Sequence, residues 1–274
     1  MVTSMFEALA RDIRSERPVA LAEVIEGPPD LVGSKLVVRP GPPEEVLGSL
    51  GDPDLDRVVR RDALGELAAG ITVTRHYGLH GEARERAVSV FIESFAPPPK
   101  MIIFGAVDFT AALVKVAKVL GYRVTVCDAR PVFATKARFP QADEVVVSWP
   151  DRHLGEVGST LGPRDVVCVL THDPKFDVPA IVAALSTSAG YLGAMGSRRT
   201  TDERNERLRA AGVDEADLAR VMAPIGLDLG ARTPEETAVA ICGEIIALRA
   251  GRHPQSLRDQ AGPIHADRVL SAGR

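Results

Sequence analysis

Hydrophobic and polar positions change their spacing near residue 100, at the proline run of residues 97–99. Before it, the spacing predicts two helices and four strands. The helices cover residues 4–16 and 54–69, and the strands cover residues 18–25, 34–39, 71–76 and 86–94. Because proline cannot continue a helix or a central strand, residues 97–100 should form a stiff linker. We therefore expect a small α+β domain over residues 1–96.

After the linker, short apolar runs alternate regularly with helical patterns. Strands are expected at residues 101–104, 123–127, 144–147 and 165–170, with a fifth beginning at 190–192, and helices at 109–119, 177–187, 200–211, 214–219 and 234–249. This alternation predicts a parallel sheet with helices on both faces. The fold class is α/β, and residues 101–250 should form a Rossmann-like doubly wound domain. Residues 251–274 lose the periodicity, which predicts an extended or disordered tail.

Composition narrows the classes of function. The 274 residues include 33 basic and 37 acidic side chains, for a formal net charge of −4. Without a basic patch, we expect no nucleic-acid partner. Cys127, Cys168 and Cys242 are far apart inside apolar runs, a pattern typical of buried free thiols in a reducing compartment. Since no run approaches the ~20 apolar residues that span a bilayer, we expect a cytoplasmic protein without membrane insertion.

The first candidate site is the loop from Gly105 to Asp108, which follows a strand and opens a helix. In dinucleotide-binding loops, glycines turn the chain and let the backbone approach the pyrophosphate at the helix N-terminus. Only Gly105 is retained here, and Val107 stands where the second glycine is expected. Asp128 ends the second strand, where an acid would bind a ribose hydroxyl, and Arg130 is placed to bind a phosphate. Alternatively, Gly105 only turns the chain and Asp128 caps a strand.

The second candidate site is Thr171, His172 and Asp173, directly after the fourth strand. Ligands of doubly wound sheets bind outside the carboxyl ends of the strands, so this loop should face the ligand. His172 is the candidate acid or base near neutral pH, or a candidate metal ligand, and Asp173 would orient it. The alternative is that Asp173 or Asp177 caps the next helix while His172 bonds locally. We identify no set of ligands for a metal.

Two further loops follow later strands. Gly196, Ser197 and Arg198 open a helix, and backbone N–H groups with a guanidinium suit an anion. A glycine turn followed by a solvated helix is the alternative. Gly226 and Asp228 lie in a glycine-containing loop that is suited to packing close to a ligand.

Together these segments resemble the XdhC/CoxI family of accessory factors for xanthine dehydrogenase and related molybdenum hydroxylases. The resemblance covers about residues 101–250. It rests on IIFGAVDFTAALVKVAKVLGYRVTVCDARPVFAT, RFPQADEV, LTHDPKFD, YLGAMGSRRT and PIGLDLGARTPEETAVAICGEII, in this order.

The resemblance implies a protein that binds molybdenum cofactor (molybdopterin), assists its sulfuration and hands it to an apo molybdenum hydroxylase of the xanthine dehydrogenase type. It also implies a cysteine desulfurase as a partner and a homodimer. The family's Rossmann domain makes a nicotinamide nucleotide, NAD(P), the alternative cofactor.

Three segments depart from the family pattern. Asp108 replaces the usual histidine of the first loop. The glycine-rich segment Gly48 to Gly51 continues into Asp52, where the family continues Gly-Gly-Cys. His80 lies in the segment where a second cysteine is usual. The sequence therefore lacks the cysteines on which a thiol role in cofactor handling would depend.

Three functions remain open at this point. The first is a maturation chaperone without turnover, whose polar loops hold the phosphate and the pterin of molybdopterin. The second is an NAD(P)-dependent oxidoreductase with His172 as proton donor. The third is a nucleotide-sensing regulator of a hydroxylase. Val107 in the first loop favours the chaperone over the oxidoreductase, so we interpret the chain as a non-catalytic maturation factor.

Overall fold

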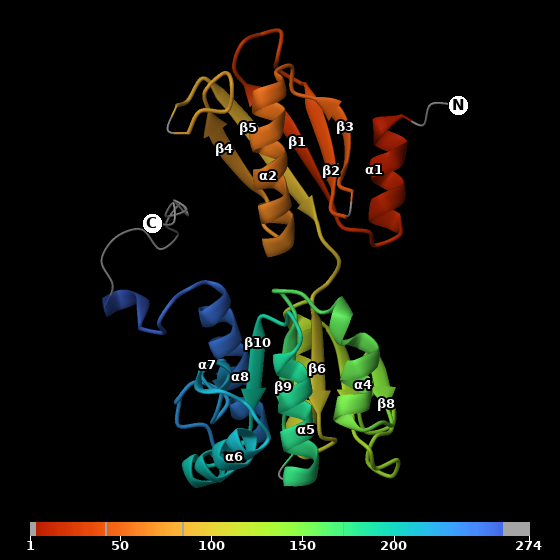
Figure 1. Ribbon diagram of the computed structural model, residues 1–274, viewed down its shortest axis with the longest axis vertical. Helices are drawn as coiled ribbons and strands as arrows, with labels where there is room; N and C mark the ends of the chain where they lie inside the picture. Colours follow the sequence, from red (N-terminus) through yellow and green to blue (C-terminus); the bar gives the residue numbers. More distant parts are fainter. Residues whose placement is uncertain (1–3, 42, 84, 172, 260–274) are drawn as a thin grey trace.

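The computed structural model describes residues 4–41, 43–83, 85–171 and 173–259. Each half of the chain forms its own sheet, and the proline-containing segment Ala96 to Pro99 connects the two (Figure 1). None of the helices in these ranges is long and apolar enough to cross a membrane.

The first half is an antiparallel sheet with one helix on each face. Its elements are α1 (Met5–Arg14), β1 (Val19–Glu26), β2 (Lys35–Arg39), β3 (Glu45–Ser49), α2 (Pro53–Ala69), β4 (Val73–Tyr77) and β5 (Val88–Phe95). The strand order is β3-β2-β1-β5-β4. Leu55, Val59 and Ala63 of α2 belong to the main core, whereas Leu9 of α1 packs with Val19 in a smaller cluster. The two helices predicted from the sequence thus cover the two faces of the sheet.

Strand β3 was missed by the sequence pattern because four of its five residues are exposed. The expected glycine-rich loop begins inside this strand. Gly48 has φ +89°, and a Cβ there would lie 2.3 Å from the carbonyl oxygen of Lys35 in β2. Glycine at position 48 therefore allows the edge strand β3 to pair closely with β2.

The second half is a parallel six-stranded sheet. Its strands are β6 (Lys100–Phe104), β7 (Arg123–Cys127), β8 (Glu144–Val146), β9 (Val166–Val169), β10 (Tyr191–Ala194) and β11 (Val221–Met222). The order is β11-β10-β9-β6-β7-β8. Numbered within the domain, this is the 3-2-1-4-5-6 order of dinucleotide-binding Rossmann folds. The predicted fold class is confirmed, with β11 added as a sixth strand.

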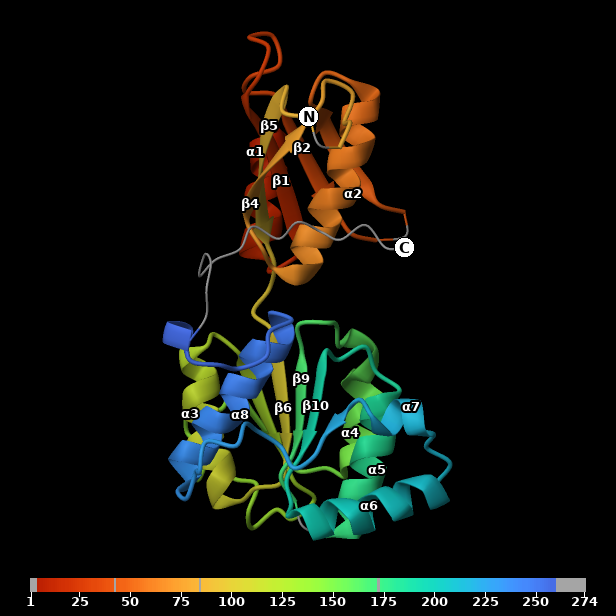
Figure 2. The same cartoon turned by 90° about the vertical axis from the view of Figure 1, so that its left-hand side faces the viewer.

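Helices cover both faces of this sheet (Figure 2). They are α3 (Asp108–Val119), α4 (Pro150–Val157), α5 (Pro174–Leu185), α6 (Arg198–Ala210), α7 (Glu215–Leu218) and α8 (Pro234–Arg249). Leu113 of α3 and Ile241 of α8 join one buried cluster, and Ile181 of α5 and Leu208 of α6 join a second. The two clusters lie on opposite faces because side chains alternate along each strand. Helix α4, only eight residues long, was not expected from the sequence.

The three cysteines are buried and unbridged, as predicted. Of the expected tail, the structure describes residues up to 259, including a 3₁₀ turn at Leu257–Asp259. Residues 260–274 lie outside the described part of the chain.

Candidate functional site

The loops after β6 and β9 meet at the point where the strand order reverses. Gly105 has φ +109°, and a Cβ there would lie 2.9 Å from the Cγ2 atom and 3.1 Å from the backbone nitrogen of Thr171. Its N–H donates to the carbonyl of Cys127 at the end of β7 (2.9 Å). Glycine is therefore required where three strand ends converge, the position at which doubly wound sheets bind ligands.

Asp128 is buried beside this loop, and both of its oxygens are engaged. Oδ2 accepts from the backbone N–H of Ala106 (2.8 Å) and from Nη2 of Arg130 (2.8 Å). Oδ1 accepts from Nε (2.9 Å) and the backbone N–H of Arg130 (3.0 Å). Burial opposes ionisation, but these donors outweigh it and hold the pKa of Asp128 below its ordinary value. Asp128, which we expected to bind a ribose hydroxyl, and Arg130, which we expected to bind a phosphate, are thus hydrogen-bonded to each other.

Two residues that the sequence interpretation did not single out complete this corner. The Phe133 ring lies 4.5 Å from the Arg130 guanidinium and 5.5 Å from that of Arg138. Arg138 Nη1 donates to the carbonyl of Ala106 (2.9 Å), and Nη2 lies 3.6 Å from Asp108 Oδ1. The side chain of Asp108 is 91 % exposed. Two cations and a ring with 40 % exposure therefore flank the first loop.

Val107 takes the N-cap position of α3 without a capping side chain. It is partly buried and packs against the hydrophobic cluster that contains Leu113 and Ile241. Val107, which stands in place of the second glycine, is thus fixed by its packing against the hydrophobic core.

The loop after β9 contributes Thr171 and Asp173, whereas His172 lies outside the described residues. Thr171 is buried, and its hydroxyl has no hydrogen-bond partner among the residues described. Asp173 is the N-cap of α5, accepting from the backbone N–H of Lys175 (3.1 Å) and pairing with its Nζ (3.2 Å). The N–H of Lys175 lowers the pKa of Asp173. Asp173 therefore serves the helix start, the alternative that the sequence left open.

The loop after β10 places its three candidate residues at the start of α6. Ser197 caps the helix by accepting from the backbone N–H of Thr200 (3.1 Å). Arg198, the first residue of α6, is exposed, and Gly196 is partly buried. Further into α6, Arg204 is buried and pairs with Asp177 of α5 (Nη2–Oδ2 3.2 Å). Burial raises the pKa of Asp177 to about 6, against the opposing effect of Arg204.

The loop with Gly226 and Asp228 packs against α8. Gly226 has φ +94°, a Cβ there would lie 3.2 Å from the backbone nitrogen of Ile241, and its N–H donates to Glu244 Oε2 (3.0 Å). Tyr191 donates to the same oxygen (2.6 Å). Close packing on the helix accounts for Gly226, while Asp228 is exposed.

In the N-terminal domain, the two segments that depart from the family's cysteine pattern meet in space. His80 Nδ1 lies 2.8 Å from Asp52 Oδ2. Asp52 also caps α2 by accepting from the N–H of Leu55 (2.9 Å). The hydrogen bond to Asp52 raises the pKa of His80. A polar pair thus joins these two loops.

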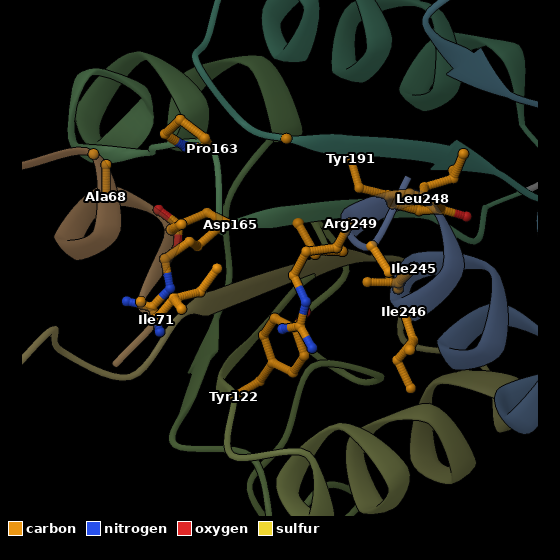
Figure 3. A pocket seen from close by; sticks show the side chains of 17 residues that line it. Ala68, Ile71, Tyr122, Pro163, Asp165, Tyr191, Ile245, Ile246, Leu248 and Arg249 are labelled. Atoms are coloured by element: carbon orange, nitrogen blue, oxygen red, sulfur yellow. The ribbon is translucent and has the colours of Figure 1, made fainter. Parts of the chain in front are cut away.

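A large cavity of about 770 Å³ lies at the opposite, amino-terminal edge of the six-stranded sheet (Figure 3). Its walls come from the end of α2, the starts of β9 and β10, and the end of α8. Polar groups also line it: Arg164 donates to the carbonyl of Pro97 (3.1 Å), and Asp165 accepts from the N–H groups of Lys100 (2.6 Å) and Gly162 (2.8 Å). Arg249, Tyr122 and Tyr191 line the cavity as well. Because both domains form it, no local sequence pattern could reveal this cavity.

The strand order defines a Rossmann fold, a class of fold whose ligands bind at the carboxyl ends of the strands. Residues 101–245 match the XdhC Rossmann domain, and residues 12–78 match the XdhC and CoxI family. The chain belongs to the XdhC family.

Named relatives agree with this assignment. A probable xanthine dehydrogenase subunit from Bacillus subtilis is 32% identical over 171 residues, covering 62% of this chain and 49% of that protein. The molybdenum cofactor insertion chaperone PaoD from Escherichia coli is 24% identical over 166 residues, covering 61% and 45%. The uncharacterized protein YqeB from Escherichia coli is 24% identical over 260 residues, covering 90% and 46%. The chain spans about half the length of these relatives.

The solved structure of a xanthine dehydrogenase from Bacillus halodurans shares the fold. Its TM-score is 0.54 at 20% identity, and the match covers 90% of this chain and 96% of that one. At this level of identity, the likeness concerns the fold alone.

Proposed function

We propose that this protein binds molybdenum cofactor and assists its sulfuration and its insertion into a xanthine dehydrogenase or a related molybdenum hydroxylase. Membership of the XdhC family and the similarity to a molybdenum cofactor insertion chaperone support this proposal. The observation that carries it is the set of loops after β6, β9 and β10, which bring the starts of α3, α5 and α6 to one edge of the sheet. Such an edge favours a phosphate-bearing ligand over a neutral one.

The residues at this edge fit a molybdopterin. Its phosphate suits the exposed guanidinium of Arg198, the amino end of α6 and the hydroxyl of Thr171, which has no hydrogen-bond partner among the residues that the structure describes. Its flat pterin suits the exposed Phe133 ring beside Arg130. In the hydroxylase, the molybdenum of the cofactor supplies the redox chemistry. In this chain, the loops bind and orient the ligand, and His172 with Asp173 is the candidate for moving a proton near it.

The chain's own thiols are poor candidates for carrying sulfur. Burial raises the pKa of Cys127 to about 12 and that of Cys242 to about 11, and it raises the pKa of Cys168 well above its ordinary value. A thiolate is the reactive form, so these three cysteines are inert at neutral pH. We therefore propose that sulfur reaches the cofactor from a cysteine desulfurase that binds to this protein. We also expect this protein to act as a homodimer.

An NAD(P)-dependent oxidoreductase or a nucleotide-sensing regulator is the second candidate. The strand order and the position of Asp128 favour it. Against it stand Val107 in the pyrophosphate loop and the four hydrogen bonds that already engage the Asp128 carboxylate. A nicotinamide nucleotide would have to compete with Arg130 for that acid.

Parallel calorimetric titrations with molybdenum cofactor, NAD(H) and NADP(H) test the proposal. Tight binding of molybdenum cofactor alone, followed by its stoichiometric release to an apo-hydroxylase, is the expected result. Binding of a nicotinamide nucleotide alone would replace the proposal with the second candidate, and steady-state NAD(P)H oxidation would then separate the enzyme from the regulator. Sedimentation velocity on the same samples tests the homodimer.

A further inference from the structure

A small pocket of about 230 Å³ lies between α5 and α6, beside the ends of β9 and β10. Figure 1 shows these two helices side by side at the edge of the sheet far from the N-terminal domain. The lining residues come from the first turns of α5 and from one face of α6: Pro174, Asp177, Val178, Thr200, Glu203, Arg204 and Arg207. The pocket is separate from the interdomain cavity, and none of the residues singled out from the sequence for ligand binding lines it.

Arg204 is the unusual residue of this pocket. Its side chain is 2 % exposed, and its Nη2 donates to Asp177 Oδ2 (3.2 Å) and to the carbonyl of Met195. Nε and Nη1 have no hydrogen-bond partner among the described residues. A buried guanidinium normally uses its whole fork of donors, because a buried charge without partners is costly.

The unpartnered atoms are concentrated around Arg204. Of seven such buried side-chain atoms in the described ranges, four belong to Arg204, Asp177 and Thr201. Thr201 is buried on α6 three residues before Arg204, and Asp177 lies across the pocket on α5. Two guanidinium nitrogens, a hydroxyl and a carboxyl oxygen in one small region thus lack partners within the described part of the chain.

Charge in the pocket is balanced between two arginines and two acids. Arg207 lies 3.9 Å from Glu203, and Glu203 is also held by Arg199 (3.0 Å). The amino ends of α5 and α6, helices of 12 and 13 residues, add positive potential. Asp177 is the buried acid that opposes an anion in the pocket, and burial raises its pKa to about 6, so it is neutralised more readily than an ordinary aspartate.

We propose that this pocket binds a tetrahedral oxyanion, either free or as the terminal phosphate of a larger ligand, with the Arg204 guanidinium as its main donor. The planar fork of arginine matches the oxygens of phosphate and sulfate. Thr200 and Arg207 complete the wall around it. A space of about 230 Å³ suits one such group and is small for a ring system. The assignment does not depend on the identity of the larger ligand, so it stands apart from the proposed function.

Calorimetry with inorganic phosphate and with phenyl phosphate tests the site on the full chain. Saturable one-site binding of inorganic phosphate is expected. Arg204→Lys keeps the charge and loses the fork, and it should weaken binding by at least about 10-fold. Arg209→Lys, the same change on α6 outside the pocket, should leave binding unchanged. If phenyl phosphate competes with inorganic phosphate, the terminal phosphate group of a larger ligand can enter the pocket. If it does not compete, the pocket binds only the free ion.

A second variant covers the case in which Arg204→Lys does not fold. Arg207→Met alters a side chain that is 46 % exposed, and it should weaken phosphate binding by about 3-fold in a folded protein. No binding of either probe to the wild-type protein would overturn the proposal, as would equal affinity in the wild-type protein and in both pocket variants.

A pH series with sulfate, which does not titrate between pH 5 and 8, adds a check. The charged groups that face Asp177 are Asp173, Arg204 and Arg207, with Glu203 also lining the pocket. Neutralising Asp177 removes a buried negative charge that opposes an anion in the pocket. Sulfate should therefore bind more tightly at pH 5.5 than at pH 7.5, and Asp177→Asn should abolish the difference. An unchanged pH profile in that variant would contradict the role of Asp177.

Discussion

The two edges of the six-stranded sheet differ in size and in chemistry. The amino-terminal edge has the larger cavity, about 770 Å³, whose walls are mainly apolar and whose Asp165 is satisfied by backbone N–H groups. The carboxyl-terminal edge has only a small pocket of about 230 Å³. Yet five of the seven buried, unpartnered side-chain atoms in the described ranges lie there. The larger cavity and most of the unpartnered polar atoms therefore lie at opposite edges of the sheet.

The difference follows from the direction of the chain. In a parallel α/β unit, every strand ends and every following helix begins at the same edge, so N–H groups and positive helix ends collect there. The interdomain cavity instead receives the carboxyl ends of α2 and α8. An anionic ligand is therefore favoured at the carboxyl-terminal edge despite the smaller space.

Breaking the Arg204–Asp177 pair should have the largest effect. Arg204→Met leaves a buried carboxyl without its cation, and we expect a loss of about 3–5 kcal/mol in the free energy of unfolding. Urea denaturation at pH 7 measures it. The double variant Arg204→Met with Asp177→Leu should recover much of the loss. An unchanged urea midpoint for the single variant would show that the pair is not buried as described.

Asp177 also predicts a pH dependence of stability. Its folded pKa of about 6 exceeds the ordinary value of 3.8, so the folded state holds the proton more tightly. The contribution of this group to stability is complete below pH 4, falls as the pH rises to about 6, and is on the order of 3 kcal/mol. Urea midpoints from pH 4 to pH 7 should show this component in the wild-type protein, and Asp177→Asn should lack it. A parallel fall in the variant would assign the effect to other groups.

Two buried aspartates permit a direct comparison of the edges. Asp128 and Asp165 each accept from two backbone N–H groups, at the carboxyl-terminal and amino-terminal edges respectively. Alanine at either position should cost about 1–3 kcal/mol in unfolding free energy. Of the two variants, only Asp128→Ala should change the affinity for molybdenum cofactor measured by calorimetry. Since the pKa of Asp128 is lowered in the folded state, its contribution is present above its unfolded pKa and is lost as the pH falls.

The smallest effect is expected at the interdomain cavity. Gly65 lies inside α2, and a Cβ there would meet nothing within 4 Å. Gly65→Ala should therefore stabilise the protein by about 0.5–1 kcal/mol through helix propensity. Thermal unfolding measures the gain, and ligand affinity should not change. A loss of affinity would indicate that the cavity takes part in binding.

The sequence predicted what depends on local pattern. The buried parallel strands stand out as apolar runs such as Met101–Phe104. The loops after them share one edge of the sheet because all of the strands run in the same direction. It missed β3 because that strand is polar and lies at an edge, and it missed α4 because that helix is short. Arg204 was hidden in a charged run, where nothing local distinguishes a buried arginine from a solvated one. Its burial depends on contact with α5, where its partner Asp177 is 27 residues away along the chain.

The most informative experiment asks at which edge of the six-stranded sheet the proposed cofactor binds. Molybdenum cofactor is titrated into the wild-type protein, into Arg198→Ala and into Ile246→Trp, which fills the interdomain cavity from a side chain that is 42 % exposed. Binding at the carboxyl-terminal edge predicts weaker affinity in the folded Arg198→Ala protein, by about 10-fold, and wild-type affinity in Ile246→Trp. Wild-type affinity in Arg198→Ala together with loss of binding in Ile246→Trp would contradict it and place the cofactor between the domains.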